Sequence, residues 1–290
     1  MTVFARRGPL PRLSMLLAAL PLLSATVTLH GQPQALAQTP AAVPCTRDIV
    51  VPVSATGASV VIDGDGVNGI YPDLLRGLEA KTGCRFVFSV VPRARQEALF
   101  ETGKADLLLP ATRTAARDRH GVFVPMMGSR ATLISIAGYR PTIRSAQELL
   151  DQRDLRVAVV RGFDYGEQYH QLLKTLAQQG RLFTEVNVAA VARLMRSGAI
   201  DMTIMAPTIL AGAIRREPRV NGLELHLRIE PIPELPWGLS GAYISRSALK
   251  EQDQALLAEL LEKTARSGAV LEGFQKYHRP EILADSVRPR

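Results

Sequence analysis

The sequence predicts an α/β protein made of two βαβαβ-type lobes, with mainly parallel sheets and a two-segment hinge between them. Three observations support this: short apolar runs alternate with helical patterns, glycines follow the helical patterns, and the order of elements occurs twice. Strands that alternate with helices form parallel sheets with helices on both faces. The 290 residues suffice for two domains, and 47% hydrophobic with 21% charged residues is a globular composition.

The first set of elements follows a Pro/Ala-rich stretch that ends near Pro44. Pro72 suits the first turn of a helix, and Gly83 is typical of the residue that ends one. Apolar runs and helical periodicity predict strands at 48–54, 85–91 and 105–110, with helices at 72–82 and 96–102 between them.

The second set repeats this order. It predicts strands at 155–160, 182–186 and 200–205, with helices at 165–179 and 189–197. Residues 99–106 match residues 194–201: each reads Leu, a large apolar residue, a charged residue, a small hydroxyl residue, Gly, two residues and Asp. Gly83 and Gly180, each at the end of a predicted helix, are separated by nearly the same number of residues as Gly103 and Gly198. This matched spacing favours two lobes of similar topology. We place one lobe at 45–132 plus 242–290 and the other at 133–241.

The N-terminus has the three parts of a signal peptide. Arg6, Arg7 and Arg12 form a positive region, residues 13–29 an uncharged apolar run, and Ala35-Leu36-Ala37 a small-x-small cleavage pattern. We therefore expect residues 1–37 to be removed and the mature chain to be periplasmic. A retained membrane anchor is the alternative.

The charge of the mature chain is mildly positive. Removing three arginines lowers the formal net charge from +8 to about +5. The chain has no basic tract and no interleaved aromatic platform, which disfavours nucleic acid as a partner. A cationic cleft for an anionic ligand is compatible with this charge.

The two cysteines, Cys45 and Cys84, precede the first and second predicted strands. In an oxidising compartment a disulfide is the default, and neighbouring parallel strands bring their amino ends together. Two free buried thiols are the alternative. Neither cysteine belongs to a CxxC pattern, and we expect no metal or cofactor.

Ligands of open α/β sheets bind at the carboxyl ends of the strands. In two facing lobes these ends lie across a cleft. The segments that follow the predicted strands are Ser54, residues 110–117, residues 161–165 and residues 206–208.

The sequence resembles the extracellular solute-binding proteins of family 3, the polar amino-acid-binding type. The resemblance rests on Gly69–Leu75 (GIYPDLL), Gly103–Leu107 (GKADL), Thr112–Arg117 (TRTAAR), Phe123–Pro125 (FVP) and the closing segment 267–277. It covers most of the mature chain through the order and spacing of these segments. It implies a fold like that of type II periplasmic binding proteins, with an amino acid held between the lobes.

The resemblance also implies a carboxylate site. In the family an arginine in a Thr-x-Thr-x-x-Arg pattern holds the carboxylate, and the pattern matches Thr112, Thr114 and Arg117. A guanidinium group matches a carboxylate with two parallel donors. The alternative is that Arg117 is a solvated helix residue, since Arg93, Arg95, Arg113 and Arg119 lie nearby. The candidate ligand-binding residues are Ser54, Tyr71, Thr112, Arg113, Thr114, Arg117, Gly162, Phe163, Asp164, Tyr165 and Ala206.

Ala206 departs from the family pattern. The family has an aspartate at this place, which takes the ammonium group of the ligand. A buried ammonium group without a carboxylate partner is costly. We therefore expect either a ligand without an α-amine or a substitute role for Asp164.

We expect a protein that captures a small polar, carboxylate-bearing ligand by lobe closure and delivers it to an ABC-type permease, a separate polypeptide. We expect a monomer and no enzyme activity, because no histidine has a triad-like spacing with Ser or Cys. One alternative is a periplasmic enzyme on the same fold, like a cyclohexadienyl dehydratase. Another is an accessory or sensory binding protein.

Overall fold

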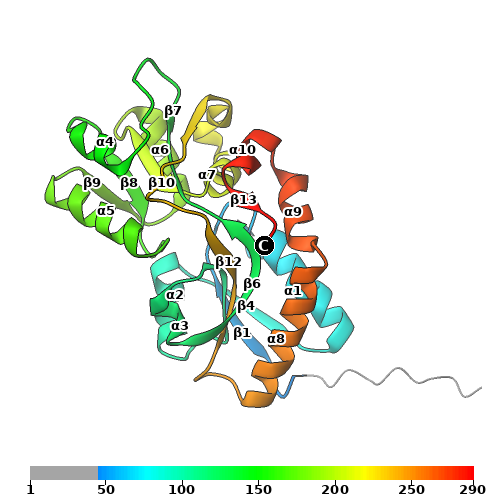
Figure 1. Cartoon of the computed structure of the whole chain (residues 1–290). Helices are drawn as coiled ribbons and strands as arrows, with labels where there is room; N and C mark the ends of the chain where they lie inside the picture. The colour runs from blue at the N-terminus through cyan, green and yellow to red at the C-terminus, as the bar shows by residue number, and fades with distance from the viewer. Residues whose placement is uncertain (1–44) are drawn as a thin grey trace, which may run out of the picture. The chain divides into compact units, whose positions relative to one another are not determined.

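The structure of the chain, a computed structural model, describes residues 45–290 and shows two lobes (Figure 1). The predicted signal peptide, residues 1–37, lies outside the described residues. The strands of the first lobe are β1 (Ile49–Val53), β2 (Val61–Asp63), β3 (Gly66–Asn68), β4 (Phe86–Val90), β5 (Leu107–Thr112), β6 (Gly121–Ser129), β12 (Gly238–Ser245) and β13 (Val287–Arg288). β1 pairs with β4 in parallel, β2 pairs with β3, and the remaining strands form a sheet of order β13-β6-β12-β5.

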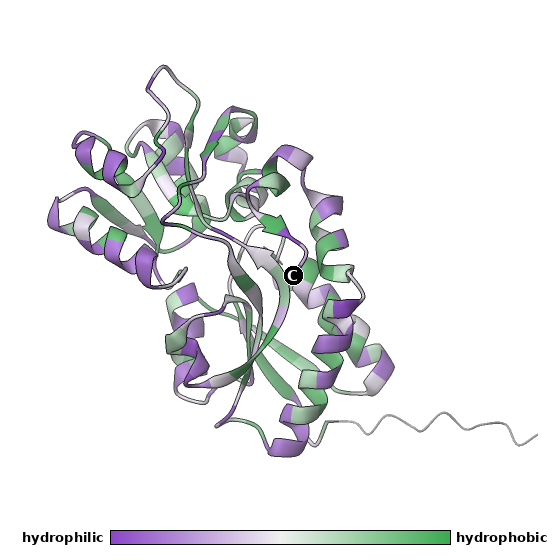
Figure 2. Cartoon of the chain, in the orientation of Figure 1, coloured by the Kyte–Doolittle hydropathy of each residue, from purple (hydrophilic) through white to green (hydrophobic). Residues whose placement is uncertain are grey.

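The helices of the first lobe place their apolar residues against these sheets. They are α1 (Ile70–Thr82), α2 (Arg93–Glu101), α3 (Ala115–Asp118), α8 (Glu251–Arg266), α9 (Ala269–Tyr277) and α10 (Pro280–Ala284). In α1, Tyr71, Leu75 and Leu78 are buried in the same core as Ile49 and Val51 of β1. Figure 2 shows this division: apolar colour follows the strands, and polar colour covers the outer faces of the helices.

The second lobe is built on one five-stranded sheet. Its strands, in spatial order, are β11 (Leu227–Glu230), β7 (Thr132–Ile136), β10 (Met202–Met205), β8 (Val157–Val160) and β9 (Leu182–Glu185). Its helices are α4 (Ala146–Asp151), α5 (Glu167–Gln178), α6 (Val188–Ser197) and α7 (Pro207–Ile214), followed by 3-10 turns at Pro218–Val220 and Leu223–His226.

The predicted two-lobed α/β class is confirmed, but the sheets are mixed rather than mainly parallel. The pairs β1–β4, β8–β9 and β8–β10 are parallel, as expected. The chain passes between the lobes twice, from β6 to β7 and back from β11 to β12. Because the two crossings run in opposite directions, β6 lies antiparallel to β12 and β7 lies antiparallel to β11. The proposed limits of the lobes, 45–132 plus 242–290 and 133–241, fall near these crossings, although β12 already pairs with β6 from Gly238 onward and β7 begins at Thr132.

The predicted repeat is present in the structure. The order β1-α1-β4-α2-β5 in the first lobe corresponds to β8-α5-β9-α6-β10 in the second. The matched glycines Gly103 and Gly198 both follow a helix and have left-handed φ values of +67° and +71°. A left-handed residue after a helix favours glycine, because glycine has no Cβ to clash.

The two lobes touch each other closely. A Cβ atom on Gly162 would lie 2.8 Å from the backbone nitrogen of Ala94 in α2. A Cβ atom on Gly212 of α7 would lie 2.5 Å from the backbone nitrogen of Ala58. Near the C-terminus, the hydroxyl of Ser286 forms a 2.8 Å hydrogen bond with the hydroxyl of Thr208. The lobes therefore contact each other at each of these places. No helix within residues 45–290 is long and apolar enough to cross a membrane.

Candidate functional site

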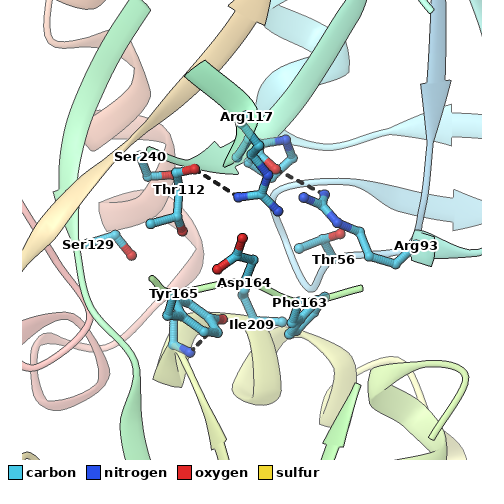
Figure 3. Close-up of a pocket in the computed structure, with 13 residues that line it drawn as sticks. Thr56, Arg93, Thr112, Arg117, Ser129, Phe163, Asp164, Tyr165, Ile209 and Ser240 are labelled. Carbon is cyan, nitrogen blue, oxygen red and sulfur yellow. Dashed lines mark hydrogen bonds between the residues drawn. The ribbon is translucent and has the colours of Figure 1, made fainter. Parts of the chain in front are cut away.

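A cavity of about 50 Å³ lies between the lobes (Figure 3). Thr112 ends β5, Phe163 to Tyr165 follow β8, and Ala206 follows β10, so these residues lie at carboxyl ends of strands. The lining residues are Thr56, Arg93, Pro110, Ala111, Thr112, Arg117, Ser129, Phe163, Asp164, Tyr165, Ala206, Ile209 and Ser240. The volume is comparable to that of one or two water molecules or a carboxylate group.

Arg117 contributes a buried guanidinium group to the cavity. The hydroxyl of Thr114 caps α3 and accepts a hydrogen bond from the backbone N–H of Arg117 at 3.3 Å, which fixes the start of its side chain. The side chain donates to both carboxylate oxygens of Glu97, at 3.0 Å and 2.8 Å, and to the carbonyl of Thr112 at 2.8 Å. A guanidinium group has five N–H donors, so two remain for a ligand.

Arg93, in the first turn of α2, places a second guanidinium group beside the first. Its Nη1 donates to the carbonyl of Pro110 at 3.0 Å, and its Nη2 lies 2.5 Å from Glu97. Its Nε is buried and has no hydrogen-bond partner among residues 45–290. Burial lowers the pKa of Arg93; attraction by Glu97 opposes this shift, and repulsion by Arg117 adds to it.

The two guanidinium groups share one carboxylate, that of Glu97. This wall of the cavity therefore carries net positive charge. A charge removed from water without full compensation is costly, and an anion that enters the cavity would offset this cost. The planar forks of Arg93 and Arg117 match the geometry of a carboxylate. The arrangement can therefore hold an anionic oxygen from the first lobe.

Asp164 faces these arginines from the second lobe (Figure 3). Its Oδ1 accepts a hydrogen bond from the backbone N–H of Gly166 at 2.9 Å and lies 2.9 Å from Nε2 of His170. These contacts hold the carboxylate at the start of α5. Within residues 45–290 no ion pair joins Asp164 to Arg93 or Arg117. Asp164 thus presents a carboxylate that a ligand cation can reach.

The hydroxyl of Tyr165 lies at the N-terminal end of α7. The backbone N–H of Ala206, the cap residue of this helix, donates to the Tyr165 hydroxyl at 3.2 Å. Burial raises the pKa of Tyr165 to about 12, while the hydrogen bond from Ala206 and the nearby Arg93 and Arg117 act in the opposite direction. The phenol therefore stays neutral at physiological pH. It satisfies a helix amide that would otherwise be free for a ligand.

Six predicted site residues line this cavity: Thr112, Arg117, Phe163, Asp164, Tyr165 and Ala206. The other five do not. Ser54 donates to Gln96 instead, Tyr71 is buried in the core of the first lobe, and Arg113 is exposed and paired with Asp118. Thr114 acts as a helix cap, and Gly162 packs against Ala94.

Sequence reasoning missed Arg93 and Glu97 as site residues. It considered Arg93 only as a neighbour of Arg117 and placed the start of α2 at residue 96, whereas the helix begins at Arg93. A signal was available, because Arg93 follows β4, the second strand of the repeat, and the ends of the repeat strands were the places predicted to line the cleft.

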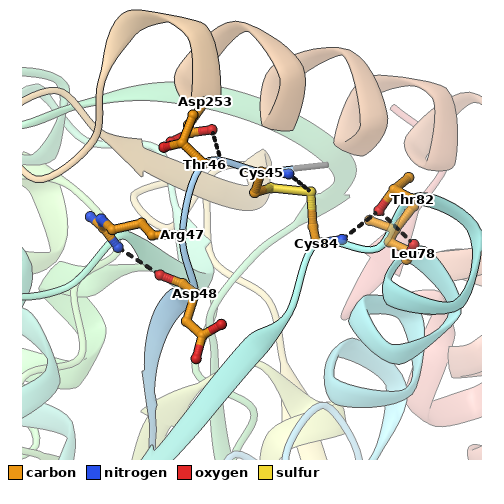
Figure 4. The surroundings of a disulfide bond; sticks show 8 residues. All are labelled: Cys45, Thr46, Arg47, Asp48, Leu78, Thr82, Cys84 and Asp253. Carbon is orange, nitrogen blue, oxygen red and sulfur yellow. Dashed lines mark hydrogen bonds between the residues drawn. A yellow bond between two sulfur atoms is a disulfide. The ribbon is translucent and has the colours of Figure 1, made fainter. Parts of the chain in front are cut away.

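The predicted disulfide between Cys45 and Cys84 is confirmed, and the alternative of free thiols is wrong (Figure 4). The Cα atoms are 4.9 Å apart, at the amino ends of β1 and β4. Thr46, beside the bridge, donates its backbone N–H to Asp253 of α8 at 2.9 Å. The bridge lies at the amino ends of these strands, whereas the cavity lies at the carboxyl ends of strands.

The described residues offer no metal site. In residues 45–290 no group of three or more His, Cys, Asp or Glu side chains is placed to hold an ion. None of the four described histidines lines the cavity; His170 reaches it only through Asp164.

No protein-family model matches the chain, and no curated protein matches it in sequence. Solved structures do match. A substrate-binding protein of an amino acid ABC transporter from Streptococcus pneumoniae, bound to L-arginine, is 18% identical with a TM-score of 0.63, covering 79% of this chain and 93% of that chain. An ancestral arginine-binding protein bound to arginine is 16% identical, with a TM-score of 0.62, and the match covers 79% of this chain and 98% of that chain.

A histidine kinase sensor domain with similarity to periplasmic binding proteins is also similar. It is 19% identical, with a TM-score of 0.62, and the match covers 80% of this chain and 96% of that domain. At these identities the likeness shows the fold. The chain has the two-lobed α/β fold of type II periplasmic binding proteins.

Proposed function

We propose that this chain is an exported solute-binding protein that captures a small carboxylate-bearing ligand between its lobes. One observation supports this most: the buried guanidinium groups of Arg93 and Arg117 share a single carboxylate at a cavity that both lobes line. The ligand carboxylate binds the remaining donors of these arginines. Because residues of both lobes contact the ligand, it stabilises the closed state over the open one.

The test measures binding by calorimetry. The protein, as exported by its host, is screened against amino acids, dicarboxylates and aromatic acids. For a ligand that binds, Arg117→Lys should weaken binding by about tenfold to a hundredfold, because the bidentate charge-assisted hydrogen bond is lost. The matched control is Arg113→Lys, since Arg113 is exposed, forms an ion pair with Asp118 and does not line the cavity. Equal affinities for the two variants would refute the proposed carboxylate site.

A variant of Asp164 tests whether the ligand carries an ammonium group. If it does, Asp164→Asn should abolish the difference in affinity between an amino acid and the same acid without its amine. If the ligand has no amine, Asp164→Asn should leave its affinity unchanged or raise it, because a nearby negative charge is removed.

Delivery to a separate ABC-type permease is the proposed fate of the ligand, and the amino acid ABC transporter proteins among the structural neighbours support it. A second candidate is a sensory role, which the sensor-domain neighbour supports. Purified permease in proteoliposomes should transport the ligand only when the binding protein is added. Transport that does not depend on the protein, together with ligand-dependent capture of a receptor kinase, would favour the sensory role.

A further inference from the structure

We call the cavity beside Arg93 and Arg117 the anion cavity. A second cavity, of about 360 Å³, adjoins it and is mostly apolar. Arg93 and Phe163 line both cavities, so the two spaces meet at these side chains. We propose that the second cavity receives the apolar part of the ligand, so that the solute is a carboxylate with a branched aliphatic or aromatic tail. This inference rests on the function proposed above and specifies its ligand class.

The apolar walls come from both lobes. Ile62, Val90 and Val91 belong to the first lobe, and Val160, Phe163 and Val186 belong to the second. Val90 is 53% exposed and Val186 is 58% exposed, and both line this one cavity, from opposite lobes, rather than lying singly on the surface. A ligand tail that enters the cavity would cover both, which gives their exposure a function.

The internal repeat explains why the cavities differ. Residues at the ends of the third strands of the two repeats, Thr112 of β5 and Ala206 after β10, line the anion cavity. Residues at the ends of the second strands, Val90 of β4 and Val186 after β9, line the apolar cavity. The cleft therefore passes from a polar end to an apolar end along the same edges of the two sheets.

Arg93 supplies a donor at the junction of the two spaces. It is 6% exposed, and its Nε has no hydrogen-bond partner among the described residues. A buried donor without a partner is costly and is satisfied by an acceptor atom on a ligand. The carboxylate therefore sits beside Arg93, with its tail directed into the apolar cavity past Phe163.

The polar side chains of the second cavity do not suit a cationic tail. They are Ser54, Arg93 and Asn187, and no carboxylate lines this cavity within residues 45–290. Ser54 already donates its hydroxyl to Gln96 at 2.9 Å. A guanidinium or ammonium tail would lose its hydration without gaining a charged partner. This argues against a ligand such as the arginine of the structural neighbours.

The experiment is calorimetry on the exported protein with a graded set of carboxylates. Acetate has no tail, whereas 4-methylpentanoate and 3-phenylpropanoate have apolar tails; L-leucine and L-phenylalanine add the amine, and L-arginine, L-glutamate and succinate have polar tails. Each buried methylene changes affinity by a factor of about four. We expect 4-methylpentanoate to bind on the order of 100-fold more tightly than acetate.

Variants locate the tail. Val186→Ser and Val90→Ser should each weaken binding of the apolar carboxylates about fivefold to tenfold and leave acetate binding nearly unchanged. Phe183→Ser is the matched control, because Phe183 is an exposed apolar residue of β9 outside the cavity. Phe183→Ser should change neither the affinity for the apolar carboxylates nor the affinity for acetate.

Three results would overturn the inference, and they are distinguishable. If only polar-tailed carboxylates bind and Arg117→Lys weakens them, the ligand class is wrong while the proposed function stands. If apolar carboxylates bind but Val90→Ser and Val186→Ser have no effect, the tail lies elsewhere. If no carboxylate binds, the proposed function fails, and the ligand class fails with it.

Discussion

The two lobes contain the same ion pair in different surroundings. In the first lobe Arg47, before β1, donates to both oxygens of Asp106, before β5, at 2.6 Å and 2.8 Å. In the second lobe Arg156, before β8, donates to Asp201, before β10, at 3.0 Å and 3.2 Å. Each aspartate thus ties the beginning of the first strand of its repeat to the beginning of the third.

Burial distinguishes the two pairs. Asp106 is 2% exposed, whereas the side chain of Asp201 is 31% exposed. The additional contacts are matched: each aspartate also accepts a backbone N–H, from Val50 or from Arg156, and each arginine also donates to a backbone carbonyl, that of Ala248 or of Gly198. The two arginine side chains are almost equally exposed, at 44% and 43%, so the pairs differ in the burial of the aspartate, and loss of a buried carboxylate costs more than loss of an exposed one. A repeated motif therefore stabilises one lobe more than the other.

The disulfide should produce the largest difference between the lobes, because it occurs only in the first. Replacing Cys45 and Cys84 with serine removes a cross-link between residues 39 positions apart, which by chain entropy is expected to lower the free energy of unfolding by about 4 kcal/mol. Urea unfolding measures the total loss. Hydrogen exchange should show faster opening in β1 and β4 than in β8 and β9; equal acceleration in both lobes would contradict this.

The ion pairs test the comparison directly. Asp106→Ala should lower the free energy of unfolding by about 3 kcal/mol, because it leaves the N–H of Val50 without its partner and Arg47 without its carboxylate. Asp201→Ala also leaves a backbone N–H, that of Arg156, without its partner, but should cost only about 1 kcal/mol because water can reach this more exposed site. Equal losses in urea titrations would show that burial does not control the strength of the motif.

His278, at the end of α9, links the lobes in a pH-dependent way. Its Nδ1 lies 2.9 Å from Arg215 of α7, and burial together with repulsion by Arg215 lowers its pKa to about 4. The unfolded histidine binds a proton near pH 6.5, so stability is lost as pH falls from 6.5 toward 4.

This loss should amount to about 2 kcal/mol between pH 7 and pH 4.5. Thermal unfolding across this range measures it. His278→Gln should reduce the pH dependence by that amount, whereas His226→Gln, at an exposed position, should behave like the parent protein. An unchanged slope for His278→Gln would show that other groups cause the loss.

The matched glycines should give the smallest difference. Gly103→Ala and Gly198→Ala each place a side chain at a left-handed φ and should each cost about 1 kcal/mol. A Cβ atom on Gly103 would lie 2.6 Å from Oγ of Ser247, whereas Gly198 has open space. Gly103→Ala should therefore be the more destabilising by a few tenths of a kcal/mol, and Gly103→Ala combined with Ser247→Gly should remove the excess.

The lobes were predictable because their elements are local. Apolar periodicity and glycines such as Gly83 and Gly198 mark the helices and strands of the repeat within short stretches of sequence. β6, β7 and β11 were not predicted, because their positions depend on pairing with strands far along the chain. For the same reason the sheets contain more antiparallel pairs than expected.

The site was predictable only where strand ends were considered. Arg117 and the segment from Phe163 to Tyr165 follow the third strand of one repeat and the first strand of the other, and both line the cavity. Glu97 was not found, because its importance comes from two arginines brought together by folding. Tyr71 lies in a motif that resembles the family, yet its side chain serves the core.

The single tryptophan of the chain lies where the lobes join. The guanidinium groups of Arg130 and Arg288 lie 4.6 Å and 4.5 Å from its ring centre, on residues beside β6 and in β13. Trp237 itself precedes β12, so one indole contacts both crossing segments and the C-terminal strand. If the lobes close on a ligand as proposed, the intrinsic fluorescence of Trp237 should therefore change without any added label, which makes closure measurable by stopped flow.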